Sequence, residues 1–141
     1  MLTKFLGIFP DGFQNRWNVN NETSADDVAF VSEIFDSLSE DTVFDLRYSF
    51  GVGVSNGAGI VNRNGKETNL LLGIAPLISQ QTTYLGTIVP PRTLSVFQVN
   101  GSADDLVPID GGNGVAGTVF MSAKDSAENW ASFFDCQPVP A

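Results

Sequence analysis

The sequence predicts an α/β fold in which a mostly parallel sheet of about four strands packs against helices. Two observations predict this class: short, nearly continuous apolar runs recur along the chain, and segments with helical periodicity separate them. Such runs are typical of parallel strands that are covered on both faces. A chain of 141 residues is long enough to bury a core, so we expect residues 1–141 to form a single domain.

Each expected strand is an apolar run bounded by turn residues. The four runs are residues 5–9, 48–54, 70–75 and 94–99. The first run superficially resembles the start of a signal peptide, but Pro10, Asp11 and Gly12 end it as a turn, and no small-residue cleavage site follows. We therefore interpret residues 5–9 as a strand.

Two segments have clear helical periodicity. Ser24 is the expected N-cap of the first helix, which carries Asp26 and Asp27 in its first turn, where negative charge suits the helix dipole. Its apolar face consists of Val28, Val31, Ile34, Phe35 and Leu38. Residues 122–134 predict the last helix in the same way. By contrast, residues 58–69 are rich in asparagine and glycine, which makes them a poor helix by propensity.

The composition excludes several classes of function. The chain contains no histidine, so neither a Ser-His-Asp group nor a histidine-ligated metal site can be built within it. The net charge of −9 and the absence of a basic cluster argue against binding to nucleic acids or to anionic membrane surfaces. No apolar run approaches the ~20 residues of a membrane span. We expect no metal and no cofactor.

The strongest chemical signal follows the second expected strand. Gly53-Val54-Ser55-Asn56-Gly57 matches G-x-S-x-G at a strand-to-helix transition. Such a turn holds its serine in strained backbone space, and its glycines let strand and helix approach closely. The pattern predicts Ser55 as a nucleophile and the backbone N–H of Asn56 as an oxyanion donor, with Gly53 and Gly57 as elbow glycines. Many inert glycine-rich turns match the same five letters.

A second polar cluster follows the fourth expected strand. Asp104 and Asp105 lie in the loop that leaves this strand, where a carboxylate could orient a catalytic base. The same residues also fit a solvated turn or, together with Asp110, a weak calcium site, although EF-hand spacing is absent. The sequence alone leaves these readings open.

Together the motifs resemble the secreted poly(3-hydroxyalkanoate) depolymerases and the related feruloyl and acetylxylan esterases of the α/β-hydrolase fold. The resemblance covers nearly the whole chain but only the central portion of the family's domain. The matching segments are residues 8–12 with Trp17, 26–30, 45–48, 55–57, 74–76, 101–104 with 107–108 and 111–112, and 126–136. Several independent motifs in the family's order are more specific than G-x-S-x-G alone.

The resemblance implies a truncated α/β-hydrolase-like three-layer sandwich that transfers acyl groups from a small ester or polyester. Ser55 would be the nucleophile and Asp104, counted back from Pro108, the triad acid. The family's histidine base and second oxyanion donor fall outside the matching span, and Asn100 stands where relatives often have histidine. The disulfide partner of Cys136 would also lie outside it. The resemblance therefore implies a weak serine carboxylic-ester hydrolase with an incomplete triad.

Two other functions stay open. The chain could be a non-catalytic, hydrolase-derived binding or interaction module, or a fragment completed by another polypeptide that carries a histidine. Because missing flanking strands would expose unpaired backbone and apolar surface, we also expect a homo-oligomer. The family suggests secretion, but no signal peptide is visible, so the localisation is not predicted.

Overall fold

The computed structural model describes residues 5–41 and 43–137. Its centre is a three-stranded parallel sheet in the order β1 (Phe50–Val54), β2 (Gly73–Leu77) and β3 (Ser95–Val96). An isolated bridge between Leu77 and Val99 continues the pairing beyond the end of β3. A small antiparallel sheet contains β4 (Gly112–Asn113) and β5 (Val119–Phe120). The described part of the chain is therefore of the α/β type, with a parallel sheet as predicted.

Helices separate the strands of the parallel sheet along the chain, with one α-helix before the first strand and one after the last. The α-helices are α1 (Asp27–Ser39), α2 (Asn56–Glu67), α3 (Thr83–Gly86) and α4 (Ala123–Phe133), and the single-turn 3-10 helices are η1 (Phe13–Asn15), η2 (Leu46–Tyr48) and η3 (Val115–Gly117). The bounds of α4 agree with the prediction to within one residue. The predicted cap of α1 is wrong, because Asp26, not Ser24, is its N-cap and accepts a hydrogen bond from the Ala29 N–H.

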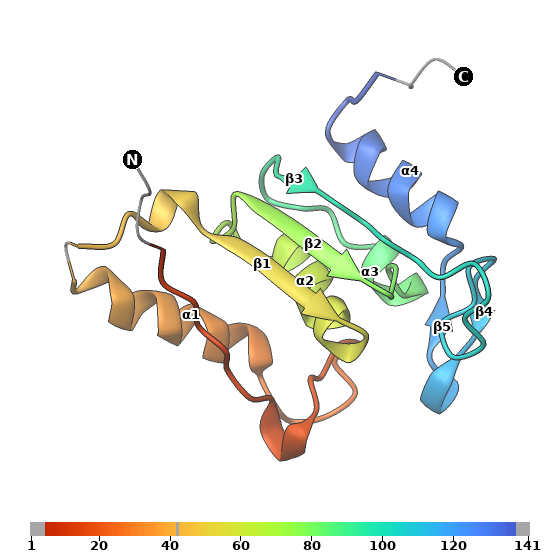
Figure 1. Ribbon diagram of the computed structural model, residues 1–141, viewed down its shortest axis with the longest axis horizontal. Helices are drawn as coiled ribbons and strands as arrows, with labels where there is room; N and C mark the ends of the chain where they lie inside the picture. The colour runs from red at the N-terminus through yellow and green to blue at the C-terminus, as the bar shows by residue number, and fades with distance from the viewer. Residues whose placement is uncertain (1–4, 42, 138–141) are drawn as a thin grey trace.

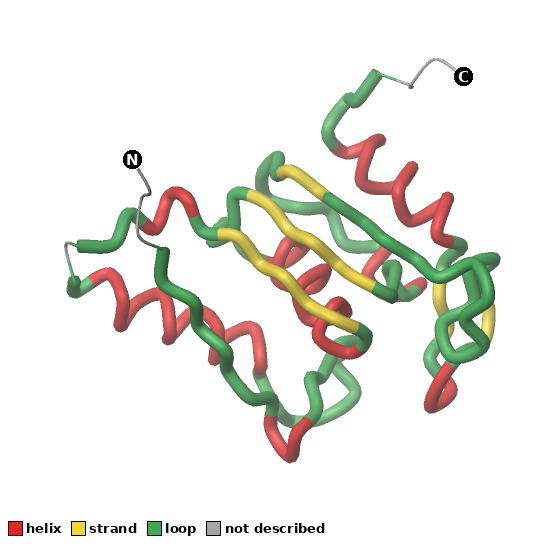
Figure 2. The backbone as a smooth tube through the Cα atoms, in the orientation of Figure 1, coloured by secondary structure: helices red, strands yellow, loops and turns green. Residues whose placement is uncertain are grey.

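The predicted strand at residues 5–9 is also wrong. These residues have no regular secondary structure, and the parallel sheet has three strands, not four, within the described residues. Phe5 and Phe9 are 90% and 92% exposed, so this apolar run buries almost nothing. A stable strand needs a neighbouring strand to pair with and a face that packs against other residues, and residues 5–9 have neither within the described structure. Figure 2 shows this segment as loop from its first described residue.

Helix α2 forms although its intrinsic propensity is poor. All residues from Ala58 to Lys66 are buried, which makes α2 the central helix of the fold. Burial against the sheet supplies the stability that asparagine and glycine do not supply locally. The glycines also permit close packing, since a Cβ on Gly65 would lie only 3.3 Å from side-chain atoms of Ile74 and Trp130. Tertiary contacts therefore override the local preference.

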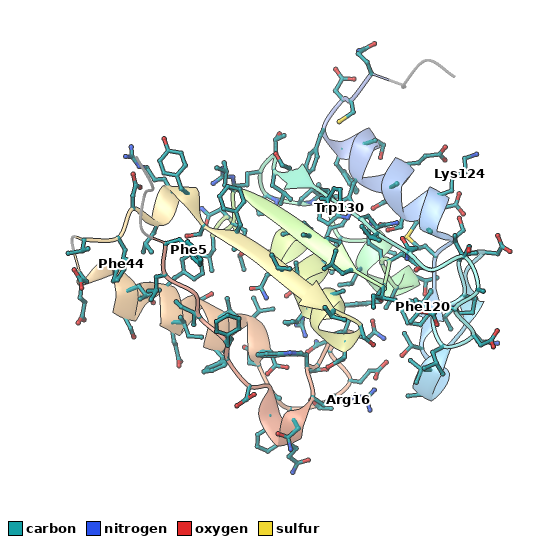
Figure 3. All side chains as sticks on the ribbon, viewed as in Figure 1. Phe5, Arg16, Phe44, Phe120, Lys124 and Trp130 are labelled. Carbon is teal, nitrogen blue, oxygen red and sulfur yellow. The ribbon has the colours of Figure 1, made fainter. Side chains whose placement is uncertain are left out.

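The core lies between the sheet and its helices on one face only. It contains Val61, Leu71, Ile74, Leu94 and Trp130, which come from α2, α4, the sheet and their connections. Figure 1 shows α2 behind β1 and β2, with no helix over the face that is turned towards the viewer. Trp130 enters the core from α4 (Figure 3). No helix in the described part is long and apolar enough to cross a membrane.

Candidate functional site

Ser55 lies at the sharp turn between β1 and α2, at the carboxyl edge of the parallel sheet. Its backbone has φ 54° and ψ −118°, a conformation that costs energy for any residue with a side chain. The neighbouring elements hold it there, because its N–H donates to the Leu77 carbonyl at 3.0 Å and its carbonyl accepts from the Ala58 N–H at 2.9 Å. The side chain is exposed. Strain and exposure together are the geometry that a serine nucleophile requires.

The two elbow glycines have different structural roles. A Cβ on Gly53 would lie 2.0 Å from the carbonyl oxygen of Gly57, so strand and helix meet there with backbone against backbone. A Cβ on Gly57 would meet nothing within 4 Å in the described part of the chain. Only Gly53 is therefore required by the close approach that the motif predicts. The expectation that both glycines are needed for that approach is wrong for Gly57.

Asn56 contributes more than the backbone N–H that the motif assigns to it. As the first residue of α2, it has no intrahelical acceptor for that N–H, and the group, next to Ser55, donates to no acceptor within the described residues. Its side-chain Oδ1 accepts from the Trp17 N–H at 2.7 Å, and its Nδ2 donates to the Trp17 carbonyl at 3.1 Å. The amide thus holds both backbone polar groups of a single residue, Trp17, which is 39 residues away in the sequence. Nothing in the sequence pattern indicated this contact.

The Trp17 loop is attached along one stripe of α2. Beyond the contact with Asn56, the Arg63 Nη1 donates to the Asn18 carbonyl, and a Cβ on Gly59 would lie 2.5 Å from Val19 Cγ2. Residues 56, 59 and 63 share a helix face, because they are three and four residues apart. Asn18 is fixed further, since its N–H donates to Asp27 Oδ2 at the start of α1. This loop therefore forms an ordered wall next to Ser55.

Asp104 lies at the same edge of the sheet as Ser55 but two strands away. Ser55 pairs with Leu77 and Leu77 with Val99, so the chain reaches the acid loop at about 10 Å from the elbow, at ~4.8 Å per strand. Asp104 is half-buried, and its Oδ1 accepts from the N–H groups of Leu106 and Val107, both at 2.9 Å. Asp104 thus shapes its own turn, and a group between it and Ser55 would be needed to connect the two.

The described lysines do not supply that group. Lys66 is eleven residues from Ser55 along α2, which corresponds to about 16 Å. Lys124 has a side chain that is 81% exposed and points away from the sheet on α4 (Figure 3), and Lys4 lies outside the described residues. The acid cluster also gathers no metal site, since no three acidic or cysteine side chains within the described ranges are placed to hold an ion. Asp105 and Asp110 are exposed loop residues.

Lys66 has a structural environment of its own. Its Nζ donates to Asn129 Oδ1 at 2.7 Å and lies 4.1 Å and 4.3 Å from the ring centres of Trp130 and Phe133. Burial lowers the pKa of Lys66 to about 8, because an ammonium loses water solvation there. The two rings favour the charged form and oppose that effect. Lys66 therefore joins α2 to α4.

A partly buried polar network lies beneath the acid loop, and no local sequence pattern predicts it. Gln80 Nε2 donates to the carbonyls of Pro108 and Met121, and its Oε1 accepts from Asn100 Nδ2 at 2.6 Å. Gln98 Nε2 donates to Asn100 Oδ1, while Gln98 Oε1 accepts from Ser126 Oγ at 2.7 Å. Asn100 is thus a link in this network. It fixes the acid loop to β3 and α4.

One cavity of the described structure lies away from Ser55. It measures about 810 Å³ and lies at the opposite end of α2, where Arg63 and Glu67 form an ion pair opposite the first turns of α1.

A scan of family models, a search of curated proteins and a search of solved structures each returned no match for this chain. The feature of this chain that bears most directly on function is therefore the geometry of the elbow at Ser55.

Proposed function

We propose that this chain is a serine carboxylic-ester hydrolase with an α/β-hydrolase-like scaffold, in which Ser55 forms an acyl-enzyme with a small ester or polyester. The observation that carries the proposal is the strained, exposed Ser55 at the carboxyl edge of a parallel sheet, with the free Asn56 N–H beside it. The poly(3-hydroxyalkanoate) depolymerase and feruloyl esterase resemblance of the sequence motifs supports the same reaction class. Both arguments lead to acyl transfer at one residue.

The proposed reaction has two steps. Ser55 Oγ attacks the ester carbonyl while its proton passes to solvent, and the Asn56 N–H stabilises the oxyanion that forms. When the oxyanion collapses, the ester C–O bond breaks: an alcohol leaves with a proton from solvent, whereas a phenol leaves as the phenolate. Water then hydrolyses the acyl-serine and releases the acid. A nucleophile without its histidine can retain on the order of 10³-fold acceleration over water from binding and oxyanion contacts. Activated esters are the expected substrates, since a phenolate leaves without being protonated.

Asp104 has a role in this proposal only when a base is supplied. An imidazole between Ser55 and Asp104 could accept the Oγ proton on one nitrogen and donate to the carboxylate from the other. The roughly 10 Å between the elbow and the start of the acid loop leaves room for such a ring. Added imidazole should therefore accelerate the reaction in a manner that depends on Ser55 and on Asp104.

Hydrolysis of p-nitrophenyl butyrate tests the proposal. We expect the wild-type rate to exceed that of Ser55→Ala and to rise with added imidazole, whereas Ser55→Ala shows only the background imidazole reaction. Ser37→Ala is the matched control, because Ser37 is an exposed serine on α1, away from the elbow. Labelling of Ser55 by a fluorophosphonate, read by mass spectrometry, gives a readout without turnover. Equal rates for wild type and Ser55→Ala would overturn the proposal.

A second candidate is favoured because the Ser55 hydroxyl makes no side-chain hydrogen bond to any described residue, and so to no base. In that case the chain is a non-catalytic, hydrolase-derived binding or interaction module, or a portion completed by another polypeptide that carries a histidine. Activity that appears only on mixing with such a polypeptide would support completion. Binding of a short ester seen by NMR without any turnover would support the module.

A further inference from the structure

One face of the parallel sheet is apolar and uncovered in the described structure. Side chains alternate across a strand, so the face opposite α2 is set by every second residue. The open face consists of Phe50, Val52, Val54, Gly73, Ala75, Leu77, Ser95, Phe97 and Val99. It contains no charged residue, although the chain carries a net charge of −9. Parallel sheets are almost always covered on both faces, which makes this face unusual for a final state.

The open face contains a trough between two rows of larger side chains. A trough of about 270 Å³ follows β2, where the floor positions are the small residues Gly73 and Ala75. Val52 on β1 and Phe97, which directly follows β3, form its walls, and they are 67% and 66% exposed. The register places Val52 directly beside Ala75, so a large side chain and a small one lie in the same row on adjacent strands. Ridge and trough are therefore one strand apart, about 4.8 Å.

We propose that this open face is the interface of a homodimer in which each copy's β1 ridge enters the other copy's trough. A twofold axis between the two sheets, parallel to the strands and above the gap between β1 and β2, exchanges these strands between copies. It brings Val52 of each copy over Ala75 of the other, large against small in both directions. Such an interface is self-complementary, as a twofold contact must be. Two stacked sheets about 10 Å apart would bury the apolar rows of both.

The area available agrees with a dimer. Taking ~200 Å² for a whole phenylalanine, the exposed parts of Phe50, Phe97 and the three valines of the face amount to on the order of 500 Å² per copy. Two copies would then bury at most about 1,000 Å², which is the threshold between weak and stable specific interfaces and agrees with a concentration-dependent dimer. The absence of charge matters equally, because copies with a net charge of −9 repel each other least where the surface is neutral. The interface is independent of the chemistry at Ser55.

Sedimentation velocity at several protein concentrations tests the dimer. We expect the wild type to sediment as a concentration-dependent dimer, and Val52→Asp to raise the dissociation constant roughly tenfold or more by placing a charge in the interface. Phe13→Asp is the matched control, since Phe13 is 65% exposed but lies outside the open face. It should leave the dissociation constant unchanged. A wild type that is monomeric at every concentration would overturn the proposal.

Ala75→Phe separates the interlocking geometry from general stickiness. The substitution adds exposed apolar surface, so unspecific association would become tighter. Our geometry requires the opposite, because the new ring fills the trough that Val52 of the other copy enters. Circular dichroism confirms that each variant is folded before the comparison. Tighter or unchanged self-association of Ala75→Phe would contradict the interlocked dimer.

Discussion

Alanine substitutions at the two elbow glycines should change stability in opposite directions. The G-x-S-x-G motif treats Gly53 and Gly57 alike, but their surroundings differ. A Cβ on Gly53 would lie 2.0 Å from the Gly57 carbonyl oxygen and 2.3 Å from its carbon, whereas a Cβ on Gly57 would have open space among the described residues. Non-bonded carbon contacts are normally ~3.5 Å or more. The first turn of α2 would therefore have to retreat by more than about 1 Å in Gly53→Ala.

The magnitude follows from competing effects. Overpacking typically costs about 1–3 kcal/mol, and here the clashing atoms are backbone and cannot rotate away. Replacing a glycine inside a strand or helix returns roughly 0.5–1 kcal/mol of chain entropy. Gly53→Ala should therefore be destabilised by about 1–2 kcal/mol, and Gly57→Ala stabilised by about 0.5–1 kcal/mol. The expected difference is on the order of 2–3 kcal/mol.

Urea denaturation followed by circular dichroism measures both effects. We expect the midpoints to move in opposite directions with an unchanged m-value, since the same surface is exposed on unfolding. Gly53→Ala should also lose fluorophosphonate labelling, because a retreating α2 moves the Asn56 N–H away from Ser55. Similar midpoints for both variants, or greater damage from Gly57→Ala, would refute the reasoning from the strand–helix approach.

Two further predictions concern the ends of α2. Asn56→Ala removes the hydrogen bonds to the N–H and to the carbonyl of Trp17, so Trp17 amide exchange should accelerate, with a loss of about 1 kcal/mol in stability. Unchanged exchange in NMR would mean that the loop is held by other contacts. The pKa of Lys66 is about 8 in the folded protein, below the ordinary value of 10.5 that applies to the unfolded chain. Between pH 8 and pH 10.5 the unfolded chain therefore binds more protons than the folded one. As the pH rises through that window, the free energy of unfolding of the wild type should increase by on the order of 1–3 kcal/mol relative to that of Lys66→Met. The lower value is expected because the two rings favour the ammonium form. Parallel stability curves in urea titrations would contradict this.

Local chemistry explains what could be predicted from the sequence. Three of the four expected strands are present, because apolar runs between turn residues supply the side chains that pack one face of the sheet against α2. Strands β1 and β2 begin two and three residues later than expected, and β3 is limited to Ser95–Val96. Helix α4 was predicted from its periodicity and the Ser122 cap, whose hydroxyl accepts from the Asp125 N–H. These signals lie within a few residues of the elements that they specify.

The failures have one physical origin. The run at residues 5–9 has the composition of a strand but no partner that covers it, and α2 has the composition of a loop but a sheet that buries it. The Asn56–Trp17 contact and the network at Gln80 connect residues that are 39 and 20 apart, a separation that no local pattern encodes. The inequality of Gly53 and Gly57 depends on how closely the first turn of α2 approaches β1 at Gly53.

The sequence by itself determined the chemical inventory of this protein: no histidine, an acidic surface, and a serine between glycines after an apolar strand. Only the tertiary structure decided the strained backbone and exposure of Ser55, its separation from Asp104 by two strands, and the sheet face that is left open. The physical reason is that residue types act through local chemistry, whereas distance and burial arise from packing between segments remote in the chain.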